Sequence, residues 1–223
     1  MVTVDPGSGS DAVQRRRTWV LGGALLAASA FAVLAAQGRL FVLSSLIDPL
    51  FALGALVLAV GIGRAGSVTA RRPLGTGAVI GLVVVIMSQP FVYSVLAPPP
   101  QRELPLRNSA SPLELVFPVT QSVMLLLAIT AVVQIGRTGV VPRPWNWAPL
   151  WSLVAVILAR ALPIAPFWSP LLASGENVAP LFQVFDVLSL LNPLAVAFLG
   201  IVAIVLGSRT EPGPVPIHPS ATP

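Results

Sequence analysis

Six polar side chains interrupt long apolar stretches of the sequence. They are Asp48, Gln89, Gln121, Arg160, Gln183 and Asp186. Ionisable groups inside a membrane are costly, and they usually mark an ion or substrate site or pair with one another. Asp48 and Asp186 have the chemistry to hold a cation or a proton, and Arg160 has the chemistry to act as a counter-charge or to clamp an anionic group. The six residues are therefore predicted to form a ligand-binding layer.

Two plainer interpretations of this layer stay open. In the first, Arg160 pairs with Asp186, and the glutamines bond to backbone groups freed by nearby prolines. The layer then only holds helices together. In the second, Arg160 extends its side chain to the outer membrane surface. Neither interpretation gives the protein a working site at this level.

The elements that position these residues are six apolar runs. They cover about residues 19–36, 41–63, 74–97, 112–135, 148–167 and 180–207. Each run is close to the ~20 residues that a helix needs to cross a hydrocarbon core of about 30 Å. Lipid offers the backbone no hydrogen bonds, so spanning segments of this length must be helices. The predicted fold class is all-α, a polytopic integral membrane protein whose six-helix transmembrane domain covers residues 15–208, with several helices kinked by proline.

Counting along these helices places the polar residues at one depth. At about 1.5 Å of rise per residue, Asp48, Arg160 and Asp186 each lie about 9 Å below the outer end of their own span. Gln89 and Gln121 fall within about 3 Å of that level. The layer is therefore expected in the outer leaflet, open to or gated from the outside.

The distribution of arginine predicts the orientation. With a cytoplasmic N-terminus, the inner segments hold Arg15, Arg16, Arg17, Arg64, Arg71, Arg72, Arg137, Arg143 and Arg209, and the outer segments hold Arg39, Arg102 and Arg107. Cytoplasmic loops carry the excess of positive charge in membrane proteins. We therefore expect both termini inside, in a multi-pass protein of a bacterial cytoplasmic membrane.

The two ends of the chain differ from the apolar middle. Residues 1–14 are polar and rich in glycine and serine, and residues 209–223 are rich in proline, so both are predicted to be disordered cytoplasmic segments. The basic start and small residues of the first apolar run also fit a cleaved signal peptide. A retained first span is preferred, because further spans follow at once.

Composition excludes several classes of function. The chain of 223 residues is 55% hydrophobic and only 9% charged, and it contains no cysteine and one histidine, His218. Thiol catalysis, disulfides and iron–sulfur clusters are excluded, and histidine-centred metal sites or Ser-His triads are not expected. No nucleotide-binding or hydrolase motif is present. We therefore expect no cofactor and no enzyme activity. We also expect no nucleic-acid partner, because the basic residues behind the net charge of +5 lie mostly between apolar runs, as in membrane proteins.

Small residues recur at helical spacing in the first run. Ala24, Ala28 and Ala32 are four residues apart, a spacing that lets helices approach closely in membranes. They are predicted to dock a partner membrane protein, with the bilayer itself as the other partner. Gly54 of the second run is an alternative contact within the same chain.

Three functions follow from these patterns. The first is transport of a small solute or ion through the polar layer, as a permease or its membrane subunit. The second is a non-catalytic scaffold or accessory subunit of a larger membrane complex. The third is an intramembrane enzyme acting on lipid, with Asp48 or Asp186 as acid or base.

Overall fold

The computed structural model describes residues 7–37, 40–62, 67–70, 72–96, 112–142, 144–161 and 186–209. Within these ranges the regular structure is helical and no strand is present. The all-α class predicted from the apolar runs is therefore confirmed for this part of the chain.

Six long helices follow one another along the sequence. They are α1 (Gly7–Gln37), α2 (Ser44–Val60), α3 (Pro73–Leu96), α4 (Pro112–Thr138), α5 (Ala148–Ala161) and α7 (Leu191–Ser208). Two short 3₁₀ turns, η1 (Phe41–Leu43) and η2 (Trp145–Trp147), lead into α2 and α5. A further helical turn at 186–189 precedes α7.

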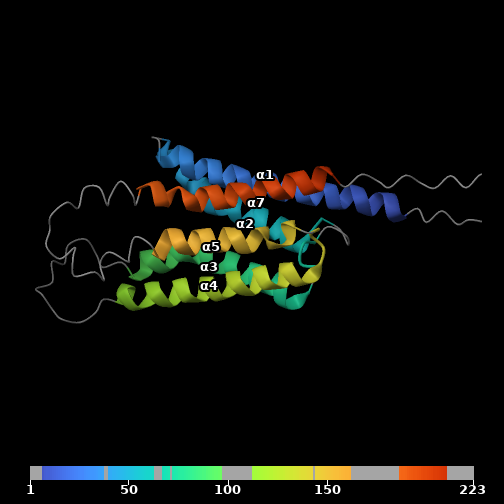
Figure 1. The fold of residues 1–223 in the computed structure, drawn as a ribbon. Coiled ribbons are helices and arrows are strands. Elements are labelled where there is room, and N and C mark those ends of the chain that lie inside the picture. The colour runs from blue at the N-terminus through green and yellow to red at the C-terminus, as the bar shows by residue number, and fades with distance from the viewer. Residues whose placement is uncertain are drawn as a thin grey trace, which may run out of the picture.

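The helices lie lengthwise beside one another and successive helices run in opposite directions (Figure 1). The most extensive packing joins α1 to α7 and to α2, while α3 packs on α4 and α2, and α5 packs on α7 and α4. The N-terminal half of α1, the starts of α3 and α5, and the ends of α2, α4 and α7 meet at one end of the bundle. Every described arginine except Arg160 lies at this end, which we call the arginine end.

Among the described residues, four helical segments are long and apolar enough to cross a membrane. These segments are Asp11–Gln37, Pro73–Leu96, Leu115–Thr138 and Asp186–Ser208. The helix Ser44–Val60 is apolar but shorter. The chain is thus compatible with a membrane protein that contacts the lipid bilayer through these helices.

The bundle has small residues inside and large apolar residues outside. Buried positions are occupied mainly by alanine, serine and threonine, with a few larger apolar residues such as Trp19 and Leu26. Leucine, valine, isoleucine and phenylalanine cover the outer surface, for example Phe31, Val84, Phe91 and Leu126. In water such a surface would aggregate, but in lipid it is favourable, and small interior residues then allow close helix packing.

Neighbouring glycines of α1 serve two different partner helices. A Cβ built at Gly23 would lie 2.5 Å from the carbonyl oxygen of Gly200 in α7. A Cβ at Gly22 would lie 2.6 Å from Cγ of Leu58 in α2, and one at Gly54 would lie 3.1 Å from the carbonyl oxygen of Gly22. Only glycine allows approach at this distance, so α1 packs closely on both of its neighbours, α2 and α7.

The start of α1 corrects a prediction from sequence. The helix begins at Gly7, so residues 7–14 are helical rather than part of a disordered lead. Asp11 lies four residues before Arg15, a spacing and order that favour a helix. Further along the same helix, Trp19 is only 3% exposed, and its Cβ packs against Gly207 of α7.

Prolines mark several helices, as the sequence predicted. Pro49, Pro90 and Pro118 lie inside α2, α3 and α4. Pro193 has no N–H to donate to the carbonyl of Ser189 four residues earlier, and the helix is interrupted by a turn at Leu190 between them. Pro163 lies outside the described residues.

Candidate functional site

Within the described residues, no hydrogen bond or ion pair joins members of the predicted polar layer to one another. Asp48, Gln121, Arg160 and Asp186 are exposed on the bundle surface, and Gln89 is half-buried. Gln183 lies outside the described residues. Asp48 stands in the second turn of α2, and Arg160 is next to the last residue of α5. The ligand-binding role of this layer stays a prediction.

The predicted pair of Arg160 and Asp186 is not seen. Within the part of the chain that the structure describes, no ion pair joins the two side chains. Both are exposed, and both lie at the bundle end opposite the arginine end. Arg160 stands next to the last residue of α5, a position from which a long side chain can snorkel; that interpretation stays a prediction.

Gln89 does join two helices. Its Nε2 donates to Sδ of Met124 at 2.9 Å, which ties the middle of α3 to α4. The bond satisfies one of the amide donors in an otherwise apolar interface. Gln89 thus links two helices, but through a side-chain sulfur and not through a backbone group freed by proline.

The hydroxyl groups gather instead at the arginine end. Ser67 and Thr69, in the turn between α2 and α3, both donate to the carbonyl of Ala59 at the end of α2. The Thr69 hydroxyl also lies 3.0 Å from that of Ser67 and 2.7 Å from that of Thr76 in α3. We call these three residues the hydroxyl cluster; it fixes the turn against both helices.

Two further threonines extend these contacts to α1 and α4. The hydroxyl of Thr18 accepts from the backbone N–H of Ile62 at 2.9 Å and donates to the carbonyl of Gln14. The hydroxyl of Thr138, at the end of α4, lies 3.3 Å from the carbonyl of Val68. The described residues of the turn after α2 are therefore bonded to four helices, α1, α2, α3 and α4.

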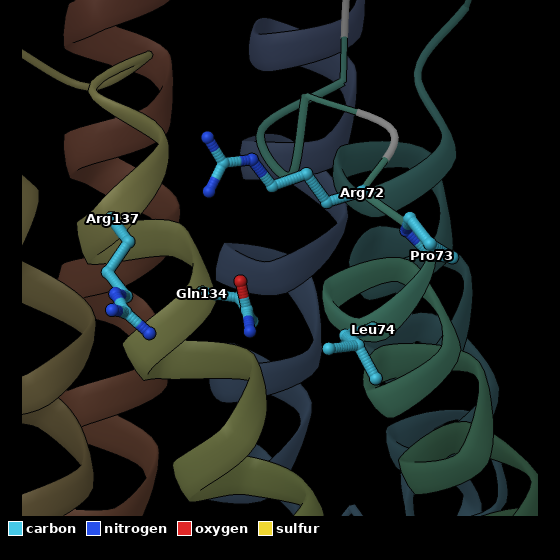
Figure 2. A pocket seen from close by; sticks show the side chains of 5 residues that line it. All are labelled: Arg72, Pro73, Leu74, Gln134 and Arg137. Carbon is cyan, nitrogen blue, oxygen red and sulfur yellow. The ribbon is translucent and has the colours of Figure 1, made fainter.

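A cleft of about 470 Å³ opens at this end between α3 and α4. It is lined by Arg72, Pro73, Leu74, Gln134 and Arg137. Figure 2 shows Gln134 between the two helices, with Leu74 facing it from α3 and Arg72 reaching across from the start of that helix. Arg72 and Arg137 are both among the lining residues, and guanidinium groups have the chemistry to bind a phosphate or carboxylate. We call this space the Arg72–Arg137 cleft.

A second cleft, of about 430 Å³, lies at the same end. Its lining includes Arg15, Trp19, Trp145 and Arg209. Arg15 donates to the carbonyl of Val140 at 3.0 Å, and its guanidinium stands 5.3 Å from the centre of the Trp19 ring. The Arg15 side chain is therefore engaged in contacts within the chain, a hydrogen bond and a cation–π contact.

Two of the three alanines predicted to dock a partner are exposed on the surface of α1. Ala24 and Ala28 are exposed, in line with Leu21 and Phe31, whereas Ala32 is 4% exposed and packs inside the chain. Gly54 of α2, the alternative contact, does lie against Gly22. Docking of a partner at Ala24 and Ala28 stays a prediction; Ala32 faces the wrong way for it.

Sequence reasoning missed the hydroxyl cluster and the Arg72–Arg137 cleft. Arg72 and Arg137 were used only to predict the orientation of the chain in the membrane, and Ser67 and Thr69 were given no role. The available signal was the pair of hydroxyl residues directly between a span and a basic turn, since such side chains bond to the free carbonyls at a helix end.

The described residues contain no group of three or more His, Cys, Asp or Glu side chains able to hold a metal ion. No protein-family model, no curated protein and no solved structure matches the chain. The function is therefore inferred from the residues and packing of the chain itself.

Proposed function

We propose that the chain crosses a bacterial cytoplasmic membrane six times, with both termini in the cytoplasm. The alternating directions of the six long helices support this count (Figure 1). For α2, 17 residues give about 26 Å and the preceding turn of three residues adds about 6 Å, close to a hydrocarbon core of about 30 Å. The gathering of arginines at one end supports placing that end inside.

Within this arrangement the protein acts as a non-catalytic scaffold or accessory subunit of a membrane complex. The observation that carries this proposal is the bare surface of α4. Only 6% of the apolar window of α4 is buried within the chain, compared with 11% for α3, 28% for the segment that contains α7 and 39% for α1. A helix that packs so little on its own chain has most of its surface available to a neighbour.

Gln121 makes α4 more than a lipid-facing helix. It is exposed nine residues after the start of α4, about 14 Å along the helix. Ser122 and Thr130 donate to carbonyls of their own helix, Pro118 and Leu126, at 2.8 Å. The Gln121 amide has no such bond within the described residues. An amide left in lipid favours association with a helix that offers a polar group.

The partner is thus a membrane-spanning helix that carries an amide or hydroxyl side chain at the level of Gln121. Two donors and one acceptor on the amide match such a side chain directly. A photo-crosslinking residue at position 121, activated in living cells, should give one discrete band of higher mass. The same probe at Leu194, an exposed position of α7, is the control and should give none.

Absence of the band at position 121, or equal bands at both positions, would contradict a partner on α4. A probe at Ala28 tests the separate expectation for the first span. The mass added at position 121 also separates a second copy of this chain from a different subunit, and either result supports a partner helix.

Transport is the second candidate, favoured by the polar side chains that α2, α5 and the turn before α7 place at the same end of the bundle. A transport cavity must admit water. Gln121→Cys, in a chain without other cysteines, would then react with a water-soluble maleimide added outside. The scaffold proposal predicts that the thiol stays unreactive, because lipid or a partner helix covers α4.

A further inference from the structure

The Arg72–Arg137 cleft has unbalanced positive charge. Within the described residues neither guanidinium has a carboxylate partner. Gln134, on the same turn of α4 as Arg137, adds an amide donor to the lining. Arginine binds phosphate oxygens through paired N–H groups, so two arginines in the lining give this space the chemistry to hold a phosphate.

The remainder of the lining is apolar and leads along the bundle. Leu74 is 67% exposed at the mouth of the cleft. One turn further along α3, Gly77 has no other group within 4 Å of where a Cβ would lie, so the helix surface is open there. Exposed Ile80 and Val84 continue this surface toward the middle of α3. A ligand with a phosphate at one end and a hydrocarbon chain at the other fits this sequence of groups.

The level of the cleft also suits a lipid. Arg72 immediately precedes the apolar segment Pro73–Leu96, and Arg137 stands in the last turn of Leu115–Thr138. In a membrane these positions coincide with the boundary between acyl chains and headgroups. Basic pockets between helices on the cytoplasmic side are known to hold anionic headgroups.

We propose that the Arg72–Arg137 cleft binds the phosphate of an anionic phospholipid of the inner leaflet, with an acyl chain lying along Leu74 and Gly77. The proposal rests on the membrane placement with the arginine end inside. It does not depend on whether α4 has a partner. A bound lipid would also link α3 to α4 next to the hydroxyl cluster.

The test is native mass spectrometry of the full chain in mild detergent, titrated with phosphatidylglycerol and, separately, with phosphatidylcholine. The wild type should bind phosphatidylglycerol with a distinct one-lipid peak and prefer it to phosphatidylcholine. The double substitution Arg72→Gln and Arg137→Gln should weaken phosphatidylglycerol binding by about tenfold or more, because both charge-assisted contacts are lost.

The matched control is Arg16→Gln with Arg17→Gln. It removes the same charge from the same end of the bundle, at exposed positions that do not line the cleft. Phosphatidylglycerol binding should stay within about twofold of the wild type, since two surface charges act only through a screened field. Equal weakening in both double variants, or no weakening in either, would overturn the proposal.

Inorganic phosphate separates a lipid site from a site for a free anion. Millimolar phosphate should not displace the lipid, because phosphate alone makes no contact with Leu74 or the Gly77 surface. Full displacement would overturn the lipid proposal in favour of a soluble anion.

Circular dichroism and thermal unfolding of each variant test whether the fold is kept. Topology mapping separates a failure here from a failure of the membrane placement.

Discussion

Gly23→Leu should prevent the bundle from assembling. A Cβ at position 23 would lie 2.5 Å from the carbonyl oxygen of Gly200 and 2.9 Å from the side chain of Ile204. The nearest atom belongs to the backbone of α7, so it has no rotamer through which to move away. Overpacking of this kind costs about 3 kcal/mol or more, a large share of a typical free energy of unfolding. Membrane abundance and thermal unfolding in detergent measure the loss.

Gly77→Leu is the matched control for this prediction. Gly77 also lies within a long apolar helix, but no other group stands within 4 Å of its Cβ position. Leucine favours a helix over glycine by about 0.5–1 kcal/mol, so this variant should be at least as stable as the wild type. If Gly23→Leu unfolds at the same temperature as the wild type, the close contact of α1 with α7 is wrong.

Thr69→Val should destabilise the arginine end strongly while keeping side-chain volume. The Thr69 side chain is 1% exposed, and its hydroxyl interacts with the carbonyl of Ala59 and the hydroxyls of Ser67 and Thr76. Valine cannot form these hydrogen bonds, so the Ala59 carbonyl and the two hydroxyl groups each lose a hydrogen-bond partner. Leaving a buried polar group unsatisfied costs about 1–3 kcal/mol. We expect a loss of about 2–3 kcal/mol in the free energy of unfolding.

Thr130→Val makes the same chemical change at an exposed position of α4. The Thr130 hydroxyl bonds only to the carbonyl of Leu126 in its own helix. That carbonyl also accepts within the helix, so the variant should change stability by less than about 0.5 kcal/mol. Equal effects of the two substitutions would show that the hydroxyl cluster does not hold the turn.

Helix class and position were predictable because they depend on length and hydropathy alone. The apolar runs starting near Phe41, Leu74, Pro112 and Ala148 correspond to helical segments beginning within a residue or so of those positions. The start of α1 was not predictable in this way. Residues 7–14 are polar, and their helix extends from an apolar segment that supplies the packing energy.

The spacing of small residues did not predict which face of α1 packs within the chain, and the reason is different. Small residues occur on every side of this helix, so spacing alone does not tell which side meets a partner. The structure selects Gly22 and Gly23 for contacts within the chain, buries Ala32 and leaves Ala24 and Ala28 exposed. Which side is chosen depends on the shapes of α2 and α7, and no pattern within α1 contains that information.

The polar layer shows the limit of counting by depth. Rise per residue placed Asp48, Arg160 and Asp186 at one level. They stand near the start of α2, near the end of α5 and in the turn before α7, and Figure 1 shows these parts of the helices at the same end of the bundle. Rise per residue does not determine the rotation of these residues about their helix axes. Within the described residues, no ion pair joins Arg160 to either aspartate. The hydroxyl cluster escaped notice because its bonds are made to backbone carbonyls, which a sequence does not display.

Single-cysteine labelling tests the membrane placement most directly, since the chain has no cysteine of its own. Leu40→Cys and Ser208→Cys introduce thiols at exposed positions on opposite ends of the bundle. In intact cells a membrane-impermeant maleimide should label position 40 and spare position 208 until the membrane is permeabilised. Labelling of position 208 but not 40 would invert the orientation, and equal labelling of both would contradict a bundle that spans the membrane.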